Sequence, residues 1–427
     1  MLNQVQVTKL KNGATIVSST EADAESVAVG IWVGVGGRYE GASQAGASHF
    51  LEHMLFKGTP TRSALKISQA IEGRGGYLNA FTQEEATCYY ARLPHEYLAH
   101  AFEVLVDMYL NAELKEEDVA RERDVILEEI KMYQDLPQHL VQEKMQEAMF
   151  QKHALGVALS GDEKSLSRMN RASLRKYMAR GYTPAATVFA FAGRIEHGAC
   201  VACVEKAIGA LPRSRALSCK PVDGAVGQGR IVTVKKEIAQ VHAVVGFRTF
   251  GRHDDRRYAM RVLNSLLGEN MSSRLFQSVR ERSGLCYSIN SSYQLFEETG
   301  VFTINGGFDM QRAEAALRLT AKELRRVMDT KVSSHEMKRA KEYLLGSYRL
   351  GLEGTGSQMM YLGDSLLGYG RVVHPEETLN GVQAVTADDL RAVANDIFNP
   401  IRMTLALVVP NTQPQDEDAW LATLSAL

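Results

Sequence analysis

The chain has 427 residues and a formal net charge of -1, with 45% hydrophobic and 23% charged side chains. This composition is typical of a soluble globular protein, and the near-zero charge argues against a nucleic-acid partner or an anionic membrane partner. The length exceeds what one hydrophobic core usually serves, so we expect two or more domains.

The amino-terminal end predicts no sorting segment. Residues 1–10 have neither the apolar core of a signal peptide nor the Arg-rich character of a transit peptide. The five cysteines are odd in number and scattered, which suits a reducing compartment. No apolar run has the length of a membrane span. We therefore expect a cytoplasmic protein without a membrane partner.

The first predicted strand, residues 27–35, is followed by the most informative motif of the chain. His49 and His53 are four positions apart, and Glu52 stands beside the second. On a helix these three side chains share one face, so the imidazoles can hold one metal ion with the carboxylate next to it. This H-x-x-E-H order is the inverse of the H-E-x-x-H of many zinc peptidases.

The alternative is that these groups are ordinary core residues of an apolar helix. Burying two imidazoles and a carboxylate without partners is costly, which favours the metal interpretation. Glu52 is then the natural general base, because a carboxylate next to the metal can take a proton from the attacking water.

Two strands, 75–82 and 87–92, and two long helices, 96–110 and 117–133, follow the motif. A catalytic zinc takes three protein ligands, so a third must come from elsewhere in the chain. The second helix offers Glu122 and Glu129, which are seven positions apart and share a face, while Glu128 points a quarter turn away. The sequence gives a face and not a distance, so it leaves this choice open.

The second half repeats the first. A Leu-Arg pair and a Pro precede the strands 187–192 and 403–408, and both are displaced by 216 positions between the copies. The other counterparts are the strands 241–250, 286–290 and 300–305 and the helices 311–328 and 334–348. Strands followed by helices in each half predict an α+β protein. We expect a catalytic zinc-binding domain at 1–222 and a repeat domain at 230–427, with the Gly-rich joint 221–229 between them.

The second copy lacks every ionisable group of the motif. Aligned on Gly58 and Gly268, its residues opposite His49, Glu52 and His53 are Ala259, Val262 and Leu263. In the helix that repeats 117–133, Ala340 and Ser347 fall opposite Glu122 and Glu129. The module therefore does not need these groups for packing, which favours a function for the first set.

Three strings, 49–59, 78–82 and 122–129, make the chain resemble the M16 metallopeptidase family, the inverzincins. Its length is similar to the M16B branch, the short enzymes like the mitochondrial processing peptidase. The resemblance covers essentially the whole chain. It implies two repeated domains, each a largely antiparallel sheet packed with helices.

The resemblance also implies the site. The third zinc ligand of the family lies 76 positions after the second histidine, which is Glu129 here, and Glu122 supports the site from outside. One Zn²⁺ per chain is expected. An Arg and a Tyr seven apart hold the substrate in the family, and Arg280 and Tyr287 match them, with Arg282 as a nearby competitor.

A peptide substrate is implied to add its backbone to an edge strand, here formed by Leu78, Asn79, Ala80 and Phe81. M16B enzymes resemble two-part shells around a chamber, so a homodimer is expected, with Arg280 and Tyr287 reaching the zinc site from the partner subunit.

The sequence thus predicts a zinc endopeptidase that hydrolyses peptides or extended leader segments inside a chamber. The alternatives are a non-catalytic structural or partner subunit of a processing-peptidase-like complex, and an enzyme that borrows its Arg and Tyr from a different chain. The complete motif disfavours the first alternative, and the presence of both residue sets in one chain disfavours the second. Residues 134–139 are less acidic than in processing enzymes, which disfavours an Arg-seeking specificity.

Overall fold

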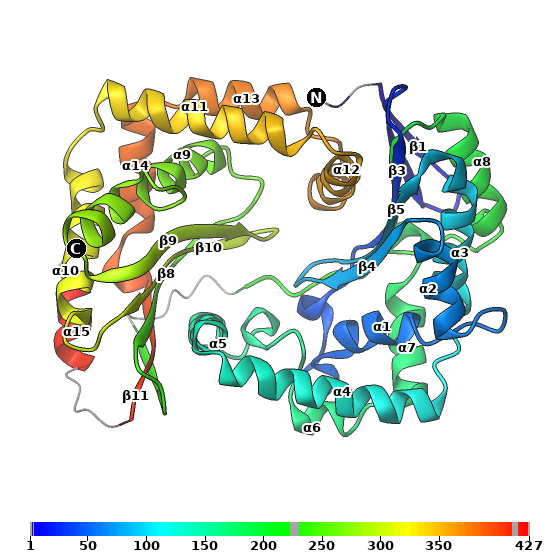
Figure 1. The fold of residues 1–427 in the computed structure, drawn as a ribbon, viewed down its shortest axis with the longest axis horizontal. Coiled ribbons are helices and arrows are strands. Elements are labelled where there is room, and N and C mark those ends of the chain that lie inside the picture. Colours follow the sequence, from blue (N-terminus) through cyan, green and yellow to red (C-terminus); the bar gives the residue numbers. More distant parts are fainter. Residues whose placement is uncertain (1, 3, 223–229, 412–416, 426–427) are drawn as a thin grey trace. The chain divides into compact units, whose positions relative to one another are not determined.

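The computed structural model describes residues 2, 4–222, 230–411 and 417–425, and these form two compact units (Figure 1). The first unit contains residues 1–130, 157–220 and 349–375, and the second contains 131–156, 221–348 and 376–427. Each unit has a sheet with helices on both faces. None of the described helices is long and apolar enough to cross a membrane.

The first unit is built on a six-stranded sheet with the strand order β1-β2-β6-β3-β5-β4. Only the β2–β6 pair is parallel. The strands are β1 (Val5–Lys9), β2 (Thr15–Thr20), β3 (Ser26–Val33), β4 (Tyr77–Thr82), β5 (Thr87–Pro94) and β6 (Thr187–Gly193).

Helices cover both faces of this sheet, so β3 is buried along almost its whole length. Val29 and Ile31 face one core, while Ala28 and Trp32 face the other. The first core takes side chains from α1 (Ala47–Leu55), α2 (Ala64–Glu72), α3 (Leu98–Asn111), α4 (Glu116–Asp135), α7 (Arg171–Gly181) and α8 (His197–Ile208). The short helix α6 (Glu163–Leu166) also contributes to it.

The second face of the sheet is covered by α12 (Thr355–Tyr369). The approach is so close at Gly363 that a Cβ there would lie 2.1 Å from the indole nitrogen of Trp32. Glycine is therefore required at this position for the helix to seat against the sheet.

The second unit has a five-stranded sheet with the order β7-β11-β8-β10-β9, in which only the β7–β11 pair is parallel. Its strands are β7 (Arg230–Lys236), β8 (Val241–Phe250), β9 (Cys286–Leu295), β10 (Thr299–Phe308) and β11 (Met403–Pro410). Its helices are α5 (Pro137–Phe150), α9 (Arg257–Leu267), α10 (Ala313–Asp329), α11 (Ser334–Gly351), α13 (Pro375–Ala384), α14 (Ala387–Ile397) and α15 (Glu417–Ser425).

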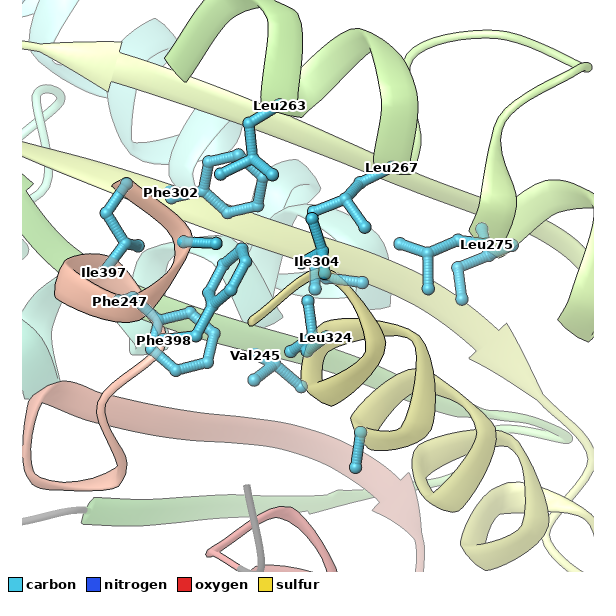
Figure 2. Packing of buried hydrophobic residues seen from close by; sticks show 14 of the residues in the cluster. Val245, Phe247, Leu263, Leu267, Leu275, Phe302, Ile304, Leu324, Ile397 and Phe398 are labelled. Carbon is cyan, nitrogen blue, oxygen red and sulfur yellow. The ribbon is translucent and has the colours of Figure 1, made fainter. Parts of the chain in front are cut away.

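The larger core of this unit lies between the sheet and α9, α10 and α14, and Figure 2 shows part of it. Phe398 packs edge-on against Phe247 and Phe302, with ring centroids 5.2 and 5.4 Å apart. Edge-to-face pairs of this kind add stabilisation beyond the burial of their area. On the opposite face, α5 packs against β8 and β11.

The predicted repeat and the predicted fold class are confirmed. The order β2-β6-β3-β5-β4 in the first sheet corresponds strand for strand to β7-β11-β8-β10-β9 in the second. Each of the strands and long helices expected from the sequence forms, with ends shifted by a few residues.

The two copies exchange one helix each. In chain order α5 follows α4 as α12 follows α11, so α5 and α12 are equivalent. Yet α5 packs on the sheet of the second unit, and α12 packs on the sheet of the first. The compact units therefore differ from the continuous ranges 1–222 and 230–427. Within the expected joint, residues 223–229 lie outside the described residues.

Candidate metal centre

The motif helix α1 is held firmly at its amino terminus. It begins after Gly46, whose φ of 89° is in the left-handed region that favours glycine. The carboxylate of Glu40 accepts hydrogen bonds from the backbone N–H groups of Gly46 and Ser48, both at 2.7 Å. These are donors that a helix leaves without an internal partner, so Glu40 caps α1 from outside the helix.

A second carboxylate fixes the turn that follows α1. Asp107 of α3 accepts hydrogen bonds from the hydroxyls of Thr59 and Thr61 and from the guanidinium of Arg62, each at 2.7 Å. The apolar side of α1 is buried in the core of the first unit. Both ends and one side of the helix are thus fixed, which leaves the histidine side for chemistry.

His49, His53 and Glu129 come together between α1 and α4. Each offers one ligand atom, and these atoms all lie within 4.8 Å of one another. The Nε2 atoms of His49 and His53 are each 3.6 Å from Oε2 of Glu129. Zinc bonds of about 2.0–2.1 Å in a tetrahedral arrangement place ligand atoms roughly 3.3–3.4 Å apart. The three side chains therefore fit a zinc ion with little movement.

Glu122, one of the two glutamates that the helix pattern left open, does not belong to this group of ligand atoms. Its Oε2 lies 3.1 Å from Nδ1 of His53, and its Oε1 lies 2.6 Å from Nζ of Lys57. The carboxylate is almost fully buried. A hydrogen bond from Nδ1 fixes the ring and directs Nε2 of His53 towards the metal position.

The surroundings set the charge of the two imidazoles differently. Burial lowers the pKa of His49 to about 4, with a further contribution from His53, so its imidazole is neutral at neutral pH. Burial also acts to lower the pKa of His53, but Glu129 and Glu122 outweigh it and raise the pKa overall. A metal ligand must give up its proton, so metal binding competes with protonation of His53.

Glu52 lies on the same helix beside the ligands. The hydroxyl of Thr82, at the end of β4, donates a hydrogen bond of 2.7 Å to its Oε2. Burial raises the pKa of Glu52, while Thr82 and His53 act in the opposite direction. A carboxylate with a raised pKa both accepts and releases a proton more readily near neutral pH.

The expected substrate strand is β4, and within the described part of the chain it is the last strand of its sheet, with β5 as its one neighbour. It contains Leu78, Asn79, Ala80 and Phe81, and it leads directly to Thr82. One backbone edge of β4 is therefore unpaired within the sheet, next to the partner of Glu52.

Arg280 and Tyr287 belong to the second unit, where they lie against each other. The Arg280 guanidinium is 5.4 Å from the ring centroid of Tyr287 and 4.5 Å from that of Phe276. It comes from the π-helical turn Phe276–Arg282. Of the two arginines considered from the sequence, Arg280 is thus the one placed over the tyrosine. The Tyr287 side chain is 82% exposed.

Comparison with known proteins identifies the family. Residues 15–163 match the family described as insulinase, peptidase family M16, and residues 168–344 match the peptidase M16 inactive domain. The chain belongs to the M16 peptidase family. The inactive-domain match begins in the first copy, just before α7, and continues into the copy without ligand residues.

Curated relatives of this M16 chain are named as uncharacterized zinc proteases. One from Mycobacterium tuberculosis is 40% identical over 399 residues, which cover 92% of this chain and 90% of the relative. Another from Bacillus subtilis is 36% identical over 402 residues, covering 94% and 97%. These names support zinc as the metal of the site.

Two solved structures share the fold. A protease from Helicobacter pylori superposes with a TM-score of 0.90 at 20% identity, covering 96% of this chain and all of that one. A protein from Pseudomonas fluorescens, described as a peptidase M16 inactive domain, gives 0.89 at 20% identity, covering 97% and 100%. At this identity the likeness concerns the fold alone.

Sequence reasoning missed three residues that shape this M16 site. Lys57 lies two positions after the last residue of α1, where helix spacing no longer applies, so no helix pattern marked it. Thr82 was seen only as the end of a strand. No local pattern marks Glu40, because it caps α1 across a loop.

Proposed function

We propose that this chain is a zinc-dependent endopeptidase that hydrolyses peptides or extended leader segments, with Glu52 as the general base. The proposal depends on one observation. His49, His53 and Glu129 lie together in a way that fits zinc, and Glu52, whose pKa is raised, lies on the helix of the two histidines. A structural role would not require this set, since the second copy folds with apolar or small residues in its place.

Zinc, when bound, acidifies water and polarises a carbonyl, and the protein supplies the rest of the chemistry. Glu52 accepts the proton of the attacking water and passes it to the leaving amine. The Thr82 hydroxyl holds the Glu52 carboxylate in one orientation during these transfers. Glu122 keeps the His53 ring in place, and Lys57 balances the negative charge of Glu122.

We further propose that substrate backbone adds to the open edge of β4. A strand with one neighbour offers main-chain donors and acceptors that any extended peptide can meet. Arg280 and Tyr287 would hold the substrate and stabilise charge in the transition state, which suits an exposed tyrosine ring under a guanidinium. In this proposal the enzyme is a homodimer around a chamber, and these two residues act from the partner subunit.

The decisive experiment measures zinc content and peptide cleavage in the same preparations. The wild type is expected to hold about one zinc per chain and to cleave peptides. Glu52→Gln should keep the zinc and lose at least about a hundredfold in cleavage rate. Glu129→Gln should lose both. The matched control is Glu128→Gln, the same change one position away on the exposed side of α4, and it should keep both. Cleavage by Glu52→Gln at the wild-type rate would refute the proposed base, and a wild type without zinc would remove the basis of the proposal.

The dimer is tested by mixing subunits. Glu52→Gln and Tyr287→Phe subunits, each inactive alone, should regain part of the activity in a mixed dimer. A well-formed mixed dimer without recovery would contradict action from the partner subunit.

A further inference from the structure

The second unit contains a cavity of about 380 Å³ whose lining includes none of the proposed zinc ligands and not Glu52. It lies where the first turns of α5 meet the sheet, over the start of β8, the start of β9 and the end of β10. Tyr287 is one of the residues that line it. The volume is within the range of about 300–1,000 Å³ that is usual for ligand pockets.

The described residues that line this cavity include no Asp, Glu, Lys or Arg. Its polar character comes mainly from side-chain carboxamides. These belong to Gln138, Gln142, Gln240, Asn290 and Asn305. The one imidazole, His242, is half-buried, and burial lowers its pKa, so it too is neutral at neutral pH. A wall of neutral groups that both donate and accept hydrogen bonds matches a ligand of the same kind.

Three of the carboxamides form a directed chain across α5, β10 and β9. Nε2 of Gln142 donates to Oδ1 of Asn305 at 2.5 Å, and Nδ2 of Asn305 donates to Oδ1 of Asn290 at 3.0 Å. Among the described residues, these three hydrogen-bonded carboxamides thus leave a carbonyl oxygen at Gln142 and an NH₂ group at Asn290 for a ligand. An acceptor and a donor at two ends complement an amide, which carries one N–H side and one C=O side.

We propose that this cavity is a subsite for an uncharged polar part of a peptide, with a Gln or Asn side chain as its best occupant. The inference rests on the proposed function in one respect, since a peptidase is what brings peptides to this surface. A carboxamide replaces the hydrogen bonds of water without a net charge to desolvate. A Glu or Lys side chain in the same place loses hydration and meets no opposite charge on the walls.

Gly307 gives a way to close the cavity without disturbing the strand. The atoms nearest to a Cβ at this position would belong to Gln240 and His242, at 3.7 and 3.8 Å, which are ordinary van der Waals distances. The residue does not have a positive φ, so a side chain is compatible with its backbone. Gly307→Leu should therefore fill the space and leave β10 intact.

Binding is measured by calorimetry on the full chain carrying Glu52→Gln, so that no probe is cleaved. The probes are three capped peptides that differ at one central position, acetyl-Ala-Ala-Xaa-Ala-Ala-amide with Gln, Glu or Lys. The Gln peptide should bind about tenfold more tightly than the other two, and Gly307→Leu should abolish this preference. Gln142→Glu should reverse it in favour of Lys. The matched control, Gln146→Glu on the same helix, does not line the cavity and should leave the preference unchanged.

Equal binding of the three peptides, or a Gln preference that survives Gly307→Leu, would overturn the proposal. The near-ultraviolet circular dichroism of each variant shows whether it is folded. If Gly307→Leu is not folded, the result for Gln142→Glu decides whether the proposal holds. Because binding is measured without catalysis, the two proposals can fail separately. If the Glu52→Gln protein prefers the Gln peptide but the wild type cleaves no peptide, the proposed function is refuted and the subsite is supported. If the wild type cleaves peptides but the Gln peptide is not preferred in binding, the subsite is refuted and the proposed function is supported.

Discussion

Replacing Glu40 by a glutamine should change how the stability of the first unit depends on pH. Glu40 caps α1, and burial raises the pKa of its carboxyl from 4.5 to about 7, although the bonds from Ser48 and Gly46 act in the opposite direction. Between these two pH values the folded protein keeps the proton and the unfolded chain has lost it. The free energy of unfolding therefore falls as pH rises from about 4.5 to about 7.

The size of this fall follows from the two pKa values. A tenfold change in the proton equilibrium is worth 1.36 kcal/mol, so the rise from 4.5 to about 7 corresponds to about 3 kcal/mol at most. The glutamine of the Glu40→Gln variant cannot ionise and adds no such slope. The variant also carries a cost of about 1–3 kcal/mol, because its NH₂ group faces a backbone N–H whose hydrogen bond an oxygen of Glu40 accepts in the wild type.

Urea unfolding of the metal-free protein at pH 5, 6, 7 and 8 tests this. A Trp420→Phe background leaves Trp32, in the sheet of the first unit, as the one tryptophan to report by fluorescence. The stability advantage of the wild type over Glu40→Gln should shrink by up to about 3 kcal/mol from pH 5 to pH 8. Glu205→Gln, at an exposed position of α8, should run parallel to the wild type. Parallel curves for Glu40→Gln as well would refute the argument from burial.

Three further changes test other contacts of the first unit. Lys57→Met should weaken zinc binding by roughly tenfold in a chelator competition, because Glu122 loses the charge that balances it, and unchanged affinity would show that Lys57 has no part in the site. Asp107→Asn should lower the free energy of unfolding by about 1–3 kcal/mol, since the carboxylate holds three donors after α1, and a thermal melt within error of the wild type would contradict this. Met359→Ala should cost about 2–5 kcal/mol in Trp32-detected unfolding, because the Met359 side chain is fully buried between α12 and the sheet, and a smaller loss would mean that the helix contributes little.

The sequence predicted most of the elements because their signals are local. Alternation marked the strands, and the H-x-x-E-H spacing placed His49, Glu52 and His53 on one face of a helix. The choice between Glu122 and Glu129 was not local. Both lie on the same side of α4. Their positions relative to α1 distinguish Glu129, the ligand, from Glu122, which supports His53.

The exchange of α5 and α12 was beyond sequence reasoning for a different reason. The apolar side of a helix shows that it packs on some sheet and does not say which one. Five strands have the same order in both sheets, so the strand order does not tell which sheet each helix covers. Close fits such as Gly363 against Trp32 select the partner, and these appear only in three dimensions.

The exchanged helices have a consequence for synthesis on the ribosome. The sheet of the first unit is complete once β6 has been made, at residue 193, but α12 is not made until residue 369. Translation typically adds about 5–20 residues per second. Until α12 has been made, the nascent chain therefore has one apolar sheet face that no helix covers. A gene fragment that ends near residue 222 would keep that face exposed permanently. Expression of either half alone should therefore give aggregates, and supplying the other half in the same cell should rescue it.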